Sequence, residues 1–231
     1  MRASCACAVQ DADIAAAPLT NNTDRARVVE FVDPPFMKFG LSILIRKRDK
    51  SKLKIDNMLA LIARRNENKI KYGCVKGGTT DSFFLRSPVL DADYRQMHSV
   101  MNADKTLLDG MTAAVQKVRQ STDRHPFAFI GEHNMLVYHA SREPCDLTVV
   151  PGGIAAYKGE YHLAVRKLSG TNPLKNQLKT ALERVNASGA LDRLYKKWWT
   201  DRSQCDWASS ATSVGYFSGM FVLVPIVAIL L

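Results

Sequence analysis

Apolar and polar positions follow two different periods along the chain. Short apolar or alternating runs predict β-strands at residues 12–18, 40–47, 126–131 and 161–167. Apolar residues at helical spacing predict α-helices at residues 56–66, 105–120, 172–189 and 190–199. Strand and helix signals alternate without an internal repeat, so the pattern predicts an α/β fold.

The expected helix at 172–189 carries clear end signals. Asn172 is a good N-cap residue, Pro173 suits the first helical turn, and Gly189 suits the residue just beyond the last turn. The sequence therefore predicts both ends of this helix.

The last 19 residues, 213–231, contain no charged side chain. This length is enough for a helix to span the hydrocarbon core of a membrane. Pro225 would kink such a helix, which is tolerated where neighbouring groups satisfy the freed carbonyl. A buried core helix is the alternative, but core helices seldom lack charge on every face. The sequence predicts a C-terminal transmembrane helix, and its stop at the last apolar residue indicates truncation.

Composition supports a folded protein and argues against nucleic acid as a partner. Of the 231 residues, 46% are apolar, which is enough for a hydrophobic core. The net charge is +10, but the basic residues are spread along the chain. The one dense basic run, residues 46–54, contains no aromatic side chain that could stack on bases.

The cysteine count is odd, so at most four cysteines can pair within the chain. Cys145 and Cys205 each lie near the end of a patterned segment, and both a bridge between them and two free buried thiols fit the sequence. Asn21 and Asn186 each begin a weak match to a glycosylation acceptor.

Residues 76–88 place two glycines before Thr79, Thr80 and Asp81 at the start of a short helical stretch. Backbone amides at such a start, with two hydroxyl groups beside them, can bind an anion. Ordinary helix capping by Thr80 or Asp81 is the alternative. Because Asp81 would repel a highly charged phosphate, a carboxylate is the better guest.

Two charged residues suit the same guest. Arg25 offers a planar fork that matches a carboxylate, and Glu132 follows an apolar strand at the end where α/β sheets bind ligands. Taken alone, each residue type fits a solvated surface position better than a ligand site. Together with the hydroxyl-rich segment, they indicate a guest that has both carboxylate and ammonium groups, which is an amino acid.

Catalysis, metal binding and cofactor binding have no comparable support. Four histidines are candidates for catalytic work, but no spacing of nucleophile, base and orienting group appears around them. They are His98, His125, His133 and His139. We therefore expect a protein that is not an enzyme and that holds neither a metal ion nor a cofactor.

Four segments, read together, resemble ionotropic glutamate receptors of the AMPA and kainate type. They are residues 12–47, which include "APLTNNTDR", residues 70–87 with "KGGTTDSFF", residues 127–146 with "FAFIGEHN", and residues 191–207. The apolar tail resembles the last membrane helix of this family. The resemblance covers the chain from about Ala12 to its end.

The resemblance implies a clamshell of periplasmic-binding-protein type, in which two α/β lobes close on an amino acid. It assigns residues 12–38 and 161–207 to lobe one, 39–160 to lobe two and 213–231 to the membrane helix. Residues 1–11 stay unassigned, and Cys145 and Cys205 occupy the positions of the family's disulfide.

The resemblance also implies a ligand set of six residues. The ligand ammonium would be held by the Pro18 carbonyl, Thr20 and Glu132. Its carboxylates would be held by Arg25, Thr79 and Thr80, with Thr79 standing where the family usually has serine.

Three departures from the family change the expected function. Residues 43–59 pass directly from one ligand-binding segment to the other, where the family crosses the membrane three times. The early part of lobe one, with the aromatic residue that covers the ligand, is absent, so we expect lobe two to fold and lobe one to fray. Glu160 stands where many relatives carry tyrosine.

These features predict a ligand-binding portion of a receptor subunit, with glutamate as the first ligand candidate, that does not conduct ions by itself. The alternative is a non-conducting amino-acid-binding module or a dominant-negative partner of full-length subunits. Membrane lipid would surround the last helix, and the ligand-binding part would be extracellular. Lys196, Lys197 and Arg202 precede that helix and favour the opposite orientation by the positive-inside rule, but charges in a folded domain are a poor guide.

Overall fold

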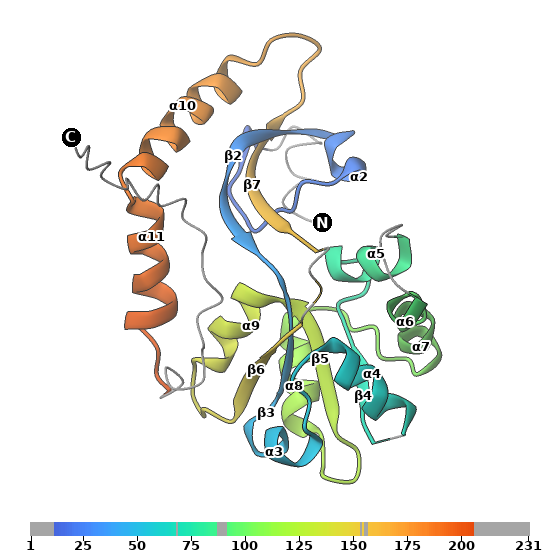
Figure 1. The fold of residues 1–231 in the computed structure, drawn as a ribbon. Helices are drawn as coiled ribbons and strands as arrows, with labels where there is room; N and C mark the ends of the chain where they lie inside the picture. Colours follow the sequence, from blue (N-terminus) through green and yellow to red (C-terminus); the bar gives the residue numbers. More distant parts are fainter. Residues whose placement is uncertain (1–11, 68, 87–91, 153, 155–156, 206–231) are drawn as a thin grey trace, which may run out of the picture.

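Two β-sheets, each with its own helices, organise the computed structural model (Figure 1). The structure describes residues 12–205 except 68, 87–91, 153 and 155–156. One sheet has three strands in the order β1-β7-β2, and we call it and its helices the first lobe. The other has four strands in the order β4-β5-β3-β6, and we call it and its helices the second lobe. The predicted α/β class is confirmed.

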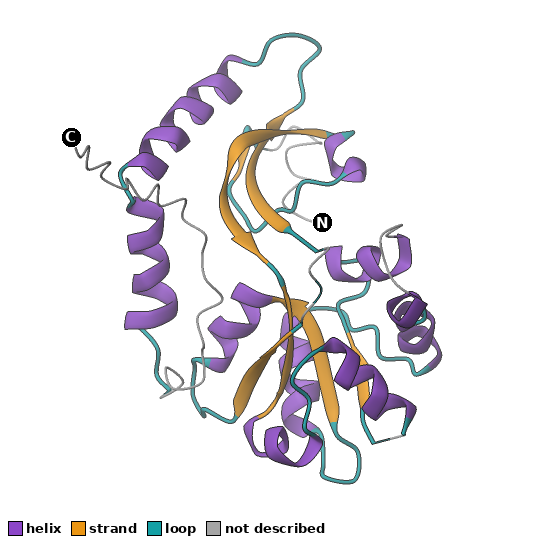
Figure 2. Ribbon diagram, in the orientation of Figure 1, coloured by secondary structure: helices purple, strands orange, loops and turns teal. Residues whose placement is uncertain are grey.

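Strands and helices are interspersed along the chain, and Figure 2 shows both types in each lobe. The strands are β1 (Ile14–Ala15), β2 (Val29–Phe39), β3 (Leu41–Arg46), β4 (Lys71–Gly73), β5 (Phe127–Glu132), β6 (Leu147–Pro151) and β7 (Gly159–Arg166). The helices are α2 (Thr23–Ala26), α3 (Lys50–Leu53), α4 (Met58–Asn66), α5 (Thr79–Arg86), α6 (Ala92–Arg95), α7 (Met97–Ala103), α8 (Met111–Gln120), α9 (His133–Ala140), α10 (Pro173–Ala187) and α11 (Ala190–Tyr195). A 3₁₀ turn, η1 (Lys47–Asp49), precedes α3, and a π-helical turn, η2 (Lys196–Asp201), follows α11.

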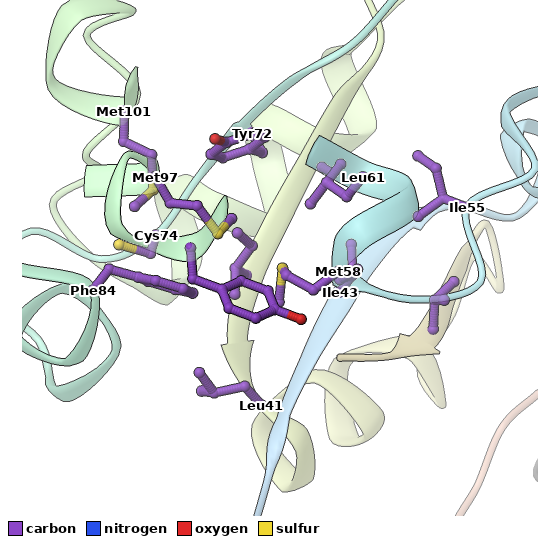
Figure 3. Close-up of a cluster of buried hydrophobic side chains, with 14 of the residues drawn as sticks. Leu41, Ile43, Ile55, Met58, Leu61, Tyr72, Cys74, Phe84, Met97 and Met101 are labelled. Atoms are coloured by element: carbon purple, nitrogen blue, oxygen red, sulfur yellow. The ribbon is translucent and has the colours of Figure 1, made fainter. Parts of the chain in front are cut away.

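The second lobe is a sheet covered by helices on both faces. Every residue of β3 is buried, and successive side chains point to opposite faces. Ile43 and Ile45 pack in the cluster that contains α4 and α7, whereas Leu44 packs with α8 and α9 on the other face. Figure 3 shows the first of these clusters, where Met58 and Leu61 of α4 lie close to Ile43.

The first lobe has a much smaller core. Its buried apolar cluster consists of Ala15, Leu19, Val29, Phe31 and Ala164. Helix α10 runs along β2 but buries only Leu182, and α11 has no buried residue. Leu194 and Trp198, in and just after α11, are 49% and 39% exposed. Less apolar surface is therefore removed from water in this lobe, so we expect it to be the less stable of the two.

We expect the backbone amides of residues 28–38 to exchange with solvent faster than those of residues 107–118, because the first lobe needs less free energy to open locally. Native-state hydrogen exchange followed by mass spectrometry measures both segments in one sample. Equal protection of the two segments would contradict a difference in stability between the lobes.

Predicted helix ends agree with the structure where a cap determines them. The side chain of Asn172 accepts a hydrogen bond from the Lys175 amide at 3.3 Å, Pro173 is the first residue of α10, and Gly189 has a φ of +68°. At this φ, a residue without Cβ is favoured.

The structure departs from the pattern at several elements, and three of them illustrate the effect of tertiary contacts. The helix expected at 105–120 begins only at Met111, because the Thr106 hydroxyl donates to the Tyr72 carbonyl at 2.6 Å and holds the chain extended before it. The strand expected at 12–18 shortens to Ile14–Ala15. Strand β2, with 11 residues the longest, was not expected from the pattern.

Strands β2 and β7 connect the two lobes. They pair antiparallel from Val29↔Arg166 to Phe39↔Gly159, and one residue, Gly40, separates β2 from β3. A Cβ atom on Gly159 would lie 2.3 Å from the Phe39 ring, so only glycine allows the ribbon to pair this closely.

No helix in the described part of the chain is long and apolar enough to cross a membrane. The transmembrane helix predicted at residues 213–231 lies outside the described residues.

Candidate ligand site

Arg25 is held in place from both its backbone and its side chain. Its amide donates to the side chain of Asn22, the N-cap of α2, at 2.9 Å. Its Nη1 donates to the Thr20 carbonyl at 3.0 Å. The guanidinium is half-buried beside the loop that the sequence predicted for ligand binding.

The loop at residues 18–20 is fixed against β7. The His162 amide donates to the Leu19 carbonyl at 3.0 Å, and Thr20 forms an isolated antiparallel bridge with Tyr161. Pro18 is exposed, whereas Thr20 is buried. This pairing places the Thr20 side chain in the first lobe within reach of the second.

Thr79 is the first residue of α5, and its hydroxyl lies 3.3 Å from the Thr20 hydroxyl, to which it donates. Thr80 next to it is buried. The two predicted hydroxyl groups from opposite lobes therefore meet directly. Arg86 and Asp24 form a second contact between the lobes, an exposed ion pair at 3.1 Å.

Asp81 has a structural role that the sequence left open. Its Oδ2 accepts a hydrogen bond from the Gly77 amide at 2.7 Å, and its Oδ1 lies 3.2 Å from Nε2 of His98. The Asp81 carboxylate thus caps the loop before α5. Capping by Asp81 was one of the two interpretations of this segment. Thr79 remains at the helix start with its hydroxyl directed to Thr20.

Glu132 ends strand β5, as predicted, and is half-buried. The Tyr161 hydroxyl donates a hydrogen bond to its Oε2. Burial raises the pKa of Glu132 above its ordinary value of 4.5, while the Tyr161 hydrogen bond and the positive charge of Arg25 offset part of that rise. Arg25 and Glu132 therefore lie close enough for their opposite charges to interact.

Two tyrosines belong to this site and were not predicted. Burial, and next the charge of Glu132, raise the pKa of both Tyr157 and Tyr161, so both stay protonated at neutral pH. The Tyr157 hydroxyl is buried and has no hydrogen-bond partner among the described residues. The alternating pattern at 161–167 predicted a strand, but a residue's distance from Glu132 cannot be derived from that pattern.

Glu160, noted in the sequence as a departure from the family, forms an ion pair with Lys38 at the lobe connection and also lies near His162. It lies opposite Lys38 in the β2–β7 ladder, with 3.4 Å between Nζ and Oε1. Its Oε2 lies 3.6 Å from Nε2 of the buried His162. The Glu160 carboxylate thus contacts both Lys38 and His162.

Replacing Glu132 with glutamine is expected to raise the melting temperature at neutral pH. A carboxyl whose pKa is raised by folding stabilises the folded state fully below its unfolded pKa, and this contribution is lost as the pH rises through the folded pKa. Glutamine carries no charge at either pH, so it avoids this loss of stability. The gain in melting temperature should therefore appear at pH 7.5 and vanish near pH 4. Thermal unfolding at both values, with exposed Glu143→Gln as control, measures it. A lower melting temperature at pH 7.5 would contradict the cost of burying this charge.

The predicted disulfide is present between Cys145 and Cys205, with 5.4 Å between the Cα atoms. It joins the turn after α9 to the chain after η2, where the Gln204 amide also donates to the Ser141 carbonyl at 2.8 Å. Cys74 is a buried free thiol, whereas Cys5 and Cys7 lie outside the described residues. Asn186 is exposed on α10, and its glycosylation stays a prediction.

One pair resembles catalytic machinery. Ser42 Oγ lies 2.9 Å from Nδ1 of His133, a distance that suits a nucleophile and its base. Ser42 is 2% exposed, however, so a substrate cannot reach its hydroxyl. Within the described residues, no cluster of three or more His, Cys, Asp or Glu side chains could hold a metal ion.

Known proteins share both the sequence and the fold. Residues 6–201 match the family model described as bacterial extracellular solute-binding proteins, family 3. Human glutamate receptor 3 is 35% identical over 166 residues, which are 68% of this chain and 18% of the receptor, and the rat protein gives the same values. The chain thus spans less than a fifth of these curated relatives.

A solved structure, Drosophila muscle GluRIIB in complex with glutamate, superposes with a TM-score of 0.72 at 26% identity. The match covers 86% of this chain and 72% of that structure. These findings confirm the resemblance to the ligand-binding portion of ionotropic glutamate receptors and the periplasmic-binding-protein-like fold. The relatives are receptors and solute-binding proteins, which confirms the expectation that the chain is not an enzyme.

Proposed function

Because the chain belongs to the family of extracellular solute-binding proteins, family 3, we propose that it binds an amino acid, with glutamate as the first candidate, between its two lobes. The observation that carries this proposal is the placement of Arg25 and Glu132. A cation from the first lobe and a carboxylate from the second interact electrostatically, and two threonine hydroxyls meet beside them.

Each charged group suits one end of an amino acid. The Arg25 guanidinium would bind the α-carboxylate through two parallel hydrogen bonds, and Glu132 would bind the ammonium. Thr79 and Thr80, at the start of α5, would bind the second carboxylate of glutamate. Thr20 and the Pro18 carbonyl would complete the ammonium site, as the resemblance implies.

The contacts between the lobes indicate what a ligand would replace. The Thr79 hydroxyl donates to Thr20, and the Tyr161 hydroxyl donates to Glu132. A ligand carboxylate would accept from Thr79, and a ligand ammonium would donate to Glu132. Without a ligand, the polar groups that would bind it therefore form hydrogen bonds with each other. These hydrogen bonds lower the free-energy cost of burying the groups.

Calorimetric titration of the full chain in a nonionic detergent with glutamate, and with glycine for comparison, tests this proposal. We expect saturable binding of glutamate that is stronger than that of glycine, because only glutamate carries a second carboxylate for Thr79 and Thr80. A chain shown to be folded that releases or absorbs no heat with glutamate would contradict the proposal.

The direct connection between β3 and α4 favours a role that does not include ion conduction by this chain. The connection consists of η1, α3 and a few further residues, in a position where the family's pore segments would be inserted. A non-conducting subunit that assembles with full-length receptors is the second candidate function. Residues 213–231 would anchor it in membrane lipid, with the disulfide-bonded lobes outside the cell. Recovery of no complex after co-expression with a full-length glutamate receptor subunit would contradict this role.

A further inference from the structure

A basic hollow lies at the end of the second lobe opposite the amino-acid site. It has a volume of about 510 Å³ and is lined by Arg46, Lys47, Arg48, Arg119 and Asp146. Strand β3 pairs with Glu132 at Leu41 and reaches the hollow at Arg46. Five strand residues span about 17 Å, so the hollow and the amino-acid site are separate.

Strand, turn and helix termini fix the walls of the hollow. Arg46 is the last residue of β3, η1 follows it directly, and Arg119 lies in the last turn of α8. The Lys47 amide donates to the Asp146 carbonyl at 2.7 Å, which holds the turn against the chain before β6. The positions of Lys47 and Arg48 are thus set by the backbone of the sheet and not by a free loop.

The buried guanidinium of Arg46 forms the rigid floor. It donates to both carboxylate oxygens of Asp49, at 2.7 and 2.8 Å, and to Asp123 at 3.0 Å, and it also donates to the Ser121 carbonyl. Arg46 and Asp49 are each 4% exposed at the side chain. Arg46 therefore supplies charge and shape, whereas its donors are already engaged.

The other cations exceed the carboxylates available to them. Arg119 pairs with Asp146 at 3.0 Å, and Lys52 pairs with Asp123 at 2.7 Å. Arg48 reaches only the same Asp123, at 3.7 Å, and no ion pair is formed by Lys47 with any described residue. The hydrogen bond and charge of Lys52, followed by the charge of Arg48, lower the pKa of Asp123, which reports a positive local potential.

We propose that this hollow is a second binding site, for the phosphate group of a small phosphorylated molecule or of a lipid headgroup. Lys47 and Arg48 provide donors that are not saturated by the protein, and Arg46 and Arg119 add fixed positive charge behind them. The hollow and its surroundings hold more cations than carboxylates, and a phosphate dianion would neutralise the excess of two positive charges. The five cations are Arg46, Lys47, Arg48, Lys52 and Arg119, and the three carboxylates are Asp49, Asp123 and Asp146. The volume is within the range of about 300–1,000 Å³ of small-molecule sites.

An amino acid fits this hollow less well. The one lining carboxylate, Asp146, is engaged by Arg119, so no free acceptor remains for an ammonium group. A compact anion with several acceptor oxygens instead matches a surface on which the groups left without a partner are donors.

Titration of the full chain in nonionic detergent with inorganic pyrophosphate at 0.15 M NaCl tests the proposal. We expect saturable binding that Lys47→Gln/Arg48→Gln weakens at least tenfold. Lys50→Gln/Lys54→Gln is the matched control, because it removes the same charge from the same segment outside the lining. It should change the affinity less than threefold.

The proposed site would be wrong if the unchanged protein did not bind pyrophosphate. It would also be wrong if both double variants lost the same affinity, because that result would indicate only a diffuse positive surface. Arg25→Lys should leave pyrophosphate binding intact, and this separates the site from the proposed amino-acid site. Phosphatidylcholine vesicles with and without phosphatidylinositol 4-phosphate distinguish the sources. Binding that requires the phosphoinositide and is stronger than binding of pyrophosphate assigns a headgroup, and binding of pyrophosphate alone assigns a soluble phosphate.

Discussion

Replacing Arg25 with lysine is expected to weaken glutamate binding by roughly two to four decades. Removing the guanidinium partner of a bound carboxylate, in a site closed to water, costs about 3 to 5 kcal/mol of binding free energy. Each decade in affinity corresponds to about 1.4 kcal/mol. Lysine keeps the charge but cannot hold the Thr20 carbonyl and a carboxylate with one planar group. Calorimetric titration with glutamate measures the loss.

Arg27→Lys is the matched control for this prediction. Arg27 follows α2 directly and is exposed, and among the described residues its side chain pairs only with the exposed Asp24, at 3.8 Å. Its replacement should leave affinity unchanged. Unfolding temperatures of both variants should match that of the unchanged protein. A loss of tenfold or less for Arg25→Lys would remove Arg25 from the ligand site.

Replacing Cys145 and Cys205 together with serine is expected to lower the free energy of unfolding by about 4 kcal/mol. The disulfide closes a loop of 60 residues, and such a constraint reduces the conformational entropy of the unfolded chain. The loss is large beside the 5 to 15 kcal/mol that stabilises a typical domain. Urea denaturation followed by circular dichroism measures it.

A reducing agent provides the control for the disulfide prediction. It should lower the stability of the unchanged protein by a similar amount and leave the double variant unaffected. Hydrogen exchange should increase first in α10 and α11, because these helices bury little apolar surface and the disulfide fixes the chain that follows them. A loss of less than about 1 kcal/mol would show that other contacts hold this segment in place.

Features determined by local chemistry were predictable from the sequence. The Asn172 cap with Pro173 defined α10, and the short run around Ile43 predicted a strand where β3 lies. Strand β2 was not predictable in this way. Its centre contains Pro34 and Pro35, which lack amide donors, and its register shifts between Val32 and Met37. Pairing with β7, whose residues lie 120 or more positions later in the sequence, keeps this strand extended.

The same distinction applies to the candidate site. Arg25, Thr79 and Glu132 were identified because their residue types and the elements around them suit an amino acid. The position of Tyr161 against Glu132 depends on how β7 returns between the lobes, which no local pattern encodes. The donor to the Asp81 carboxylate was likewise not predictable, because the hydrogen bond from the Gly77 amide depends on the actual geometry of the turn.

The short helix α3 makes the second lobe tolerant of insertion. None of its residues is buried, and it lies beyond the Arg46–Asp49 pair that completes the sheet end. Lengthening a surface connection costs little loop entropy, since the cost grows only with the logarithm of its length. A large segment can therefore enter or leave the gene at this point while the buried sheet is retained. In evolutionary terms, the two lobes can be inherited as one module that other segments join at a single exposed turn.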